Sequence, residues 1–197
     1  MRLTINHTHR GLSPADAHQL YQWLFWDVSI SHDYDLSQEL AKSDIWYPIN
    51  RFGTENRARA ELNNSPVLQR FCREFDQLKD VFFDMIKNDK FFQWRWTQPA
   101  DAYLERISMV TAIYKDMPGH VMQPHLDNSH IMMQTVINLR DNPSSTDLYS
   151  FIDQSPIYQS TRERDKGVTF LNTPGAVHGI TNLEHDRYIL YSALMYS

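Results

Sequence analysis

The 197-residue chain has a single cysteine, Cys72, only six glycines, and no long hydrophobic run. One cysteine excludes an internal disulfide framework, and the neighbouring Phe71 and Phe75 predict a buried thiol in a reducing compartment. No apolar stretch approaches the roughly 20 residues of a membrane-spanning helix. The first residues also lack the charged and apolar regions of a signal peptide. These absences predict a cytoplasmic protein with no membrane partner.

An excess of positive charge is also missing. The 19 basic and 24 acidic residues give a net charge of −5, and the pI is about 6.0. A nucleic-acid-binding protein usually shows a basic footprint, so the sequence predicts no nucleic-acid partner. Two short basic clusters, at residues 51–59 and 162–166, contain interleaved acids or polar residues and are typical of solvated loops.

Aromatic residues, by contrast, are abundant. They make up 13% of the chain, and hydrophobic residues make up 42%. This composition offsets the entropy of ordering and is typical of a globular protein with a sizeable core. The length and the absence of an internal repeat predict a single domain over residues 1–197.

Helix signals are concentrated in the first half of the chain. Ser13 followed by proline is a helix-start signal, and apolar residues at helical spacing then predict a helix over about 14–29. Ser65 followed by proline repeats the signal and predicts a longer amphipathic helix over about 66–88. Residues 1–90 are therefore expected to form a helical support.

Strand signals dominate the second half. Aromatic and polar residues alternate from Phe92 to Thr97, which is the period of a strand. Further runs rich in Val, Ile, Thr and Tyr, separated by turn residues, predict strands at 103–116, 131–139, 167–172 and 187–196. The order of helices before strands favours an α+β chain in which residues 91–197 form an all-β barrel or sandwich.

Two motifs in this β region carry metal-binding chemistry. His125 and Asp127 are spaced i, i+2, and in an extended segment such residues point the same way. The strand at 167–172 leads through a Pro–Gly turn to His178. Two imidazoles and one carboxylate form a facial triad with open coordination positions, which suits Fe(II), although zinc is chemically possible too.

The order of these residues resembles a known family. A strand tyrosine, a turn glycine, an H-x-D pair, a distal histidine and a later arginine occur here as Tyr114, Gly119, His125, Asp127, His178 and Arg187. This pattern is similar to that of the Fe(II)/2-oxoglutarate-dependent dioxygenases, especially the prolyl-hydroxylase-like branch, and covers about residues 103–197. The resemblance implies a double-stranded β-helix, or jelly-roll (cupin-like), core with the N-terminal helices packed on its outer sheet.

The resemblance also implies a role for each matching residue. His125, Asp127 and His178 would ligate Fe(II), and O2 would take an open position on the metal. Arg187 would pair with the distal carboxylate of the cosubstrate 2-oxoglutarate, and Tyr114 would hydrogen-bond the same molecule. A buried Arg187 needs an anion, and Asp127 is committed to the metal, which favours the cosubstrate as its partner.

Other interpretations remain open for several of these residues. Arg187 could instead form a surface ion pair with Asp186 or Glu184, and Tyr114 could simply fill the barrel. Prolyl hydroxylases often carry another cosubstrate-binding tyrosine on the strand that corresponds to 131–139. Here Gln134 and Asn138 share one face of that strand, and we expect them to bind the cosubstrate in its place.

The predicted function is hydroxylation of an unactivated C–H bond, with release of succinate and CO2. The expected substrate is a peptide or protein side chain, and the second candidate is a free amino acid or another small molecule. The alternative from another class is a non-catalytic jelly-roll module that binds a ligand or partner and retains a structural metal. An open three-ligand site argues against that module, because structural sites normally have four protein ligands.

Overall fold

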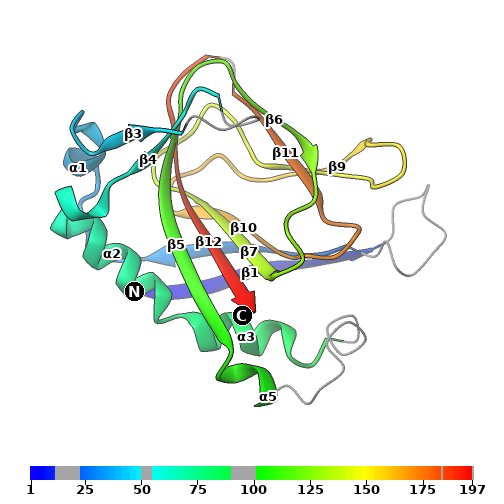
Figure 1. Cartoon of the computed structure of the whole chain (residues 1–197). Coiled ribbons are helices and arrows are strands. Elements are labelled where there is room, and N and C mark those ends of the chain that lie inside the picture. Colours follow the sequence, from blue (N-terminus) through cyan, green and yellow to red (C-terminus); the bar gives the residue numbers. More distant parts are fainter. Residues whose placement is uncertain (12–22, 50–54, 90–100, 183, 197) are drawn as a thin grey trace.

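Two antiparallel sheets face each other in the computed structural model, which describes residues 1–11, 23–49, 55–89, 101–182 and 184–196 (Figure 1). The larger sheet has the strand order β1 (Arg2–Gly11), β2 (Trp23–Ser31), β10 (Lys166–Leu171), β7 (Ile131–Asn138), β12 (Arg187–Tyr196), β5 (Ile107–Asp116), β4 (Arg57–Ala60) and β3 (Trp46–Pro48). The smaller sheet has the order β6 (His120–His125), β11 (Val177–Asn182), β8 (Asp147–Tyr149) and β9 (Pro156–Gln159).

Strands β5 to β12 form a double-stranded β-helix. The chain passes from β5 in the larger sheet to β6 in the smaller one and back to β7, then through the paired β8 and β9 of the smaller sheet to β10, and finally through β11 to β12. This is the jelly-roll arrangement, so the predicted fold class is confirmed. Three predicted strands match β7, β10 and β12 to within one residue at each end. The fourth, 103–116, begins later than expected because α5 (Asp101–Leu104) occupies its start.

Two helices cover the outer face of the larger sheet, α2 (Pro66–Asp76) against β5 and α3 (Lys79–Ile86) against β12 (Figure 1). They correspond to the helix predicted over 66–88, which is interrupted at Gln77 and Leu78. Cys72 is buried in α2 as expected, and burial raises the pKa of its thiol to about 12. A shorter helix, α1 (Ser37–Ala41), precedes β3. Over the described ranges, none of the helices has the length and hydrophobicity needed to cross a membrane.

The predicted helix over 14–29 is wrong where it can be compared, because residues 23–31 form strand β2. Leu24, Trp26 and Val28 alternate and pack into the main core beneath the helices, while Phe25 is buried in a second cluster on the opposite face. The apolar run over 23–26 hides the strand period at the start of β2, but apolar and polar residues alternate from Trp26 to Ser31, and the helix prediction overlooked this period. Residues 12–22 and the predicted strand at 92–97 lie outside the described residues.

The first part of the chain is thus not the purely helical support that the sequence predicted. Strands β1 and β2 extend the larger sheet beyond β10, and β4 and β3 extend it beyond β5. Strand β1 is mostly exposed, and β3 and β4 contain only 3 and 4 residues, so none of them carries a clear hydrophobic period. The β4–β5 pairing is the extension that bears on the site described below.

The start of α2 provides a test of this outer layer. The buried Ser65 hydroxyl accepts a hydrogen bond from the Leu68 amide at 3.2 Å and donates one to Glu39 Oε2 at 2.5 Å, which links α1 to α2. Ser65→Ala removes the cap and leaves Glu39 without this donor, so we expect the free energy of unfolding to fall by about 1–2 kcal/mol in urea denaturation. Ser108→Ala, at an exposed position of β5, is the control and should change it by less than about 0.5 kcal/mol. Equal effects of the two substitutions would contradict the capping role.

Candidate metal centre

Strand pairing brings the two predicted histidine ligands together. In the antiparallel pair of β6 and β11, His125 lies directly opposite His178. Side chains on such directly paired residues have Cβ atoms about 4.5–5.5 Å apart. Asp127 follows two residues after His125, just beyond the end of β6. The register of the smaller sheet therefore places residues from distant parts of the sequence in one cluster.

A glycine next to His178 permits this pairing. The β6–β11 register shifts between His178 and Ile180, so that Gly179 lies at an irregularity of the strand. A Cβ atom on Gly179 would come within 2.8 Å of the Met122 carbonyl oxygen on β6. Any larger residue would push the two strands apart, and the two histidines with them.

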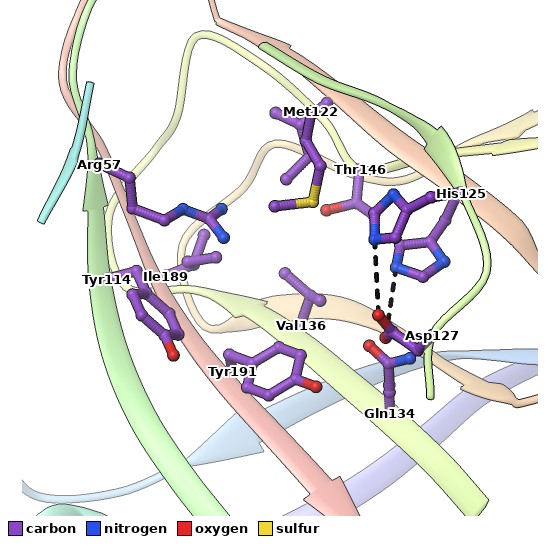
Figure 2. A pocket seen from close by; sticks show the side chains of 12 residues that line it. Arg57, Tyr114, Met122, His125, Asp127, Gln134, Val136, Thr146, Ile189 and Tyr191 are labelled. Carbon is purple, nitrogen blue, oxygen red and sulfur yellow. Dashed lines mark ion pairs between the residues drawn. The ribbon is translucent and has the colours of Figure 1, made fainter. Parts of the chain in front are cut away.

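Backbone carbonyls set the orientation of both imidazole rings. The His125 Nδ1 lies 2.9 Å from the Gln123 carbonyl oxygen, and the His178 Nδ1 lies 3.1 Å from the Ala176 carbonyl oxygen. An Nδ1–H group that donates to a carbonyl leaves the lone pair on Nε2, the tautomer that metal ligation requires. Figure 2 shows the His125 ring directed at Asp127, whose Oδ1 is 3.5 Å from His125 Nε2. The Asp127 Oδ2 is 3.6 Å from His178 Nε2.

The spacing of these three groups fits one metal ion. Their ligand atoms all lie within 4.8 Å of one another, and over the described part of the chain no other group of three metal-ligating side chains does so. Ligand bonds of about 2.0–2.2 Å at right or tetrahedral angles place the ligand atoms roughly 3.0–3.5 Å apart. Two neutral imidazoles and one carboxylate suit Fe(II) with open positions, and zinc accepts the same donors.

The cluster lies in the wall of a cavity of about 200 Å³ between the two sheets (Figure 2). This volume is below the roughly 300–1,000 Å³ of sites for drug-sized molecules, so it suits a small compound. The cavity is lined by Arg57, Tyr114, Met122, His125, Asp127, Gln134, Val136, Thr146, His178, Ile180, Ile189 and Tyr191. Arg57 lies on the side opposite Asp127, with the aromatic and aliphatic residues between them.

A buried ion cluster stands behind the Arg57 side of the cavity. The Asp116 carboxylate accepts a hydrogen bond from Arg57 Nε at 2.5 Å and another from Arg187 Nη1 at 3.0 Å. Arg187 Nη2 also donates to Thr146 Oγ1 at 2.7 Å. Arg57 is held in this position by the pairing of β4 with the end of β5, where Arg57 and Asp116 are directly opposite.

The ion cluster is positively charged overall. Burial alone would raise the pKa of Asp116, but the guanidinium groups of Arg57 and Arg187 outweigh it and hold the pKa below its ordinary value. Burial lowers the pKa of the adjacent His120, which favours the neutral ring. Within the hydrogen-bonded cluster, two guanidinium groups against one carboxylate leave an excess of one positive charge beside the cavity, which Asp147 offsets in part through its electrostatic interaction with Arg187.

The location of Arg187 corrects part of the sequence argument. Arg187 is fully buried, so a surface ion pair with Asp186 or Glu184 is wrong. The expectation that no protein carboxylate would be available to it is also wrong, because Asp116 pairs with it. Arg187 is not among the residues that line the cavity, so its assigned contact with a cosubstrate remains a prediction.

The remaining predicted site residues divide into two groups. Tyr114 and Gln134 line the cavity, and the Gln134 side chain is 1% exposed, with no hydrogen-bond partner for either amide atom within the described residues. Asn138 does not line it. Its amide nitrogen donates to the carbonyl oxygens of Thr161 and Glu163, which fixes the chain before β10.

Sequence reasoning missed Arg57 and Thr146 as residues of the cavity region. Arg57 was assigned to a solvated basic loop, but its side chain is buried. No local signal distinguishes it from the nearby arginines, because its burial depends on the long-range pairing of β4 with β5. The inward orientation of Ile189 and Tyr191 was available from strand alternation in 187–196, and both line the cavity.

No protein-family model matches the chain, and no curated protein matches its sequence. Among solved structures, the chain is similar to a Pseudomonas putida prolyl-4-hydroxylase, with a TM-score of 0.57 and 15% identity over 88% of this chain and 92% of that one. The chain has the fold of that enzyme. The resemblance to the prolyl-hydroxylase branch is thereby confirmed at the level of the fold.

Two further structures are similar in part. One is the viral collagen prolyl hydroxylase of Paramecium bursaria Chlorella virus-1, with a TM-score of 0.41, 10% identity and coverage of 72% of this chain and 80% of that one. The other is an oxidoreductase of the 2OG-Fe(II) oxygenase family from Burkholderia pseudomallei, with a TM-score of 0.40, 14% identity and coverage of 87% and 68%.

The pKa values of the two histidines predict how metal binding depends on pH. Burial lowers the pKa of His178 to about 4, so this ring is already neutral at mildly acidic pH. The interaction with Asp127 raises the pKa of His125 above its ordinary value, so this ring is protonated first as the pH falls. Metal binding must displace that proton, so affinity should decline as the pH falls through the raised pKa of His125, with release of one proton per bound ion. Calorimetric titration with Mn(II) at several pH values checks this, and a two-proton dependence between about pH 5 and 6 would contradict it.

Gln134 generates a second prediction. Each unsatisfied buried polar group costs about 1–3 kcal/mol, so Gln134→Leu should raise the free energy of unfolding of the ligand-free protein by at least about 1 kcal/mol. Urea denaturation measures this change. Gln123→Leu, on an exposed position of β6, is the matched control and should have little effect. A ligand-free protein destabilised by Gln134→Leu would show that the amide already has partners.

Proposed function

We propose that the protein is an Fe(II)- and 2-oxoglutarate-dependent oxygenase that hydroxylates an unactivated C–H bond, with release of succinate and CO2. The observation that carries this proposal is the open cluster of His125, Asp127 and His178 in the wall of a small cavity whose opposite side is cationic. Bound Fe(II) would supply the activation of O2 that is coupled to decarboxylation of the 2-oxo acid. The fold, shared with a prolyl-4-hydroxylase, supports the same class of reaction.

The donor set supports a catalytic metal rather than a structural one. A structural site usually closes with four protein ligands, whereas this cluster offers three and faces a cavity. No fourth His, Cys, Asp or Glu joins the group over the residues that the structure describes. The positions left open are those that a chelating cosubstrate and O2 require. A non-catalytic module with a structural metal is therefore the weaker proposal.

Charge balance supports a dicarboxylate as the cosubstrate. A divalent ion held by Asp127 and two neutral imidazoles has a net charge of +1, and the ion cluster beside Arg57 adds another +1. A 2-oxo dicarboxylate carries two negative charges, one beside its keto group and one at its distal end, so it neutralises both ends of the cavity. Because paired charges in a water-poor site interact strongly, a dianion of suitable length is favoured over a monoanion.

The residues between the two ends would hold and shield the cosubstrate. The side chains of Val136 and Ile189 present apolar surface to the middle of the cavity, which excludes water from the reacting atoms. Tyr114 stands beside Arg57 and offers a phenol hydroxyl at the cationic side. Gln134 lies beside Asp127 and has an unpaired amide donor and acceptor for a bound ligand.

We propose a peptide or protein side chain as the substrate, and a free amino acid as the second candidate. The similar Pseudomonas putida structure is that of a prolyl-4-hydroxylase, which supports this class. Large apolar side chains are also exposed near the smaller sheet. Leu126, between the two ligands of the H-x-D pair, is 39% exposed, and Phe151 and Ile152, in the turn after β8, are 38% and 57% exposed. Such side chains suit contact with a polypeptide better than with a small polar molecule.

Anaerobic spectroscopy tests the metal site and the cosubstrate together. Fe(II) and 2-oxoglutarate should give the wild-type protein a weak visible charge-transfer band, because the 2-oxo acid chelates the ion. His178→Ala should remove this band and weaken metal binding by more than about 100-fold. A side chain that ligates the metal directly contributes more to its affinity than the groups that orient the ligands. His185→Ala, at an exposed position, is the control. If the wild-type protein shows neither the band nor substrate-stimulated succinate formation, the non-catalytic module becomes the better account.

A further inference from the structure

The two arginines of the buried ion cluster have unequal numbers of partners. Arg187 is 0% exposed and uses both terminal nitrogens of its guanidinium, one on Asp116 and one on Thr146, while its buried Nε has no partner within the described residues. Arg57 donates to Asp116 through Nε, and its buried Nη2 has no hydrogen-bond partner within the described residues.

The two arginines also differ in their position relative to the cavity. Arg57 lines the cavity, and its guanidinium lies over the Tyr114 ring, with Cζ 5.0 Å from the ring centroid. Figure 2 shows the guanidinium of Arg57 extending into the space between Met122 and Tyr114. Arg187 does not line the cavity, and Thr146, which accepts its hydrogen bond, stands between it and the open space. A carboxylate that enters the cavity therefore contacts the guanidinium group of Arg57 before that of Arg187.

We propose that Arg57, and not Arg187, binds the second carboxylate of the 2-oxo acid, and that Arg187 is a positioning residue that holds Asp116 and Thr146 in place. This inference rests on the proposed function and deepens it. It moves the recognition of the cosubstrate to a residue of β4, outside the segment that carries the family motif. It also differs from the role that the motif alone assigns to Arg187.

The buried ion cluster is preorganised to bind a carboxylate. Asp116 anchors Nε of Arg57, and the Tyr114 ring supports the flat face of the guanidinium, so the side chain loses little freedom on binding. A carboxylate on the free Nη2 would complete a cluster of two guanidinium groups and two carboxylates. The excess positive charge would then be balanced, and an otherwise unsatisfied buried donor would gain an acceptor.

Selectivity between two 2-oxo acids tests the assignment without relying on turnover. The probes are 2-oxoglutarate and 2-oxopentanoate, which has the same five-carbon chain with a methyl group in place of the distal carboxylate. Their dissociation constants are measured by calorimetry on the Mn(II)-loaded protein. We expect the wild-type protein to prefer 2-oxoglutarate by about 10- to 100-fold, the range for a charge-assisted hydrogen bond. Arg57→Met should reduce this preference to less than about 3-fold while affinity for 2-oxopentanoate stays nearly constant.

Three further variants make the result specific. Arg59→Met, at an exposed position of the same strand, is the matched control and should keep the wild-type preference. Arg57→Lys should retain part of it, because a point charge replaces a planar fork. Arg187→Met, if it folds by circular dichroism, should bind both acids more weakly but keep the ratio between them. If Arg187→Met does not fold, the Arg57 and Arg59 variants decide the question.

The outcomes separate this inference from the proposed function. If Arg57→Met still prefers 2-oxoglutarate as strongly as the wild-type protein does, the assignment of Arg57 is wrong. If only a folded Arg187→Met loses this preference, Arg187 is the residue that binds the second carboxylate. Equal binding of the two acids by the wild-type protein also overturns the assignment of Arg57, while chelation at the metal stands. If the wild-type protein binds Mn(II) but neither acid, the proposed function fails and this inference fails with it.

Discussion

The pairing of β6 with β11 is the constraint on which the candidate site depends. It sets His125 opposite His178, and it needs a glycine at position 179 because the Met122 carbonyl comes so close. The carbonyl groups that orient both rings belong to Gln123 on β6 and to Ala176, immediately before β11. Asp127 then needs only two more residues of chain to reach the space between them. A candidate metal site with three ligands thus follows from one strand register and one short extension beyond β6.

The larger sheet shields the candidate site from water. All eight residues of β7 are buried, because one face of the strand packs under α2 and α3 while the other lines the cavity. β12 is divided in the same way: Ile189 and Tyr191 face the cavity, and Leu190 and Leu194 belong to the main core. The helices therefore contribute to function indirectly, by keeping water away from the sheet that forms the cavity wall. Charges in such an interior interact strongly, which is why the position of each arginine matters.

The sequence predicted four strands of the larger sheet and the grouping of His125, Asp127 and His178 better than the cationic side of the cavity. The H-x-D pair and the strand–turn–histidine segment are local patterns, but the strands of the smaller sheet that carry the two histidines lack a clear period and were not predicted. Arg57 depends instead on the pairing of β4 with β5, which joins distant segments and leaves no mark in the local sequence. The helix predicted over 14–29 failed at β2 for a different reason: the apolar run over 23–26 fits helical spacing, and the strand alternation from Trp26 to Ser31 was overlooked.

Charge placement also limits what the substrate can bring into the cavity. With a metal bound, Arg57 and Asp127 are the described lining residues with a formal charge, because both histidine ligands are then neutral. Under the proposed function, the metal and the distal carboxylate occupy both, and the carboxylate beside the keto group balances the remaining charge of the metal. No buried charge is then left among the described lining residues to pair with an ionised substrate group. The part of a substrate that reaches the metal should therefore be neutral, as an apolar C–H-bearing side chain is, and its charged groups should remain in solvent beyond Leu126.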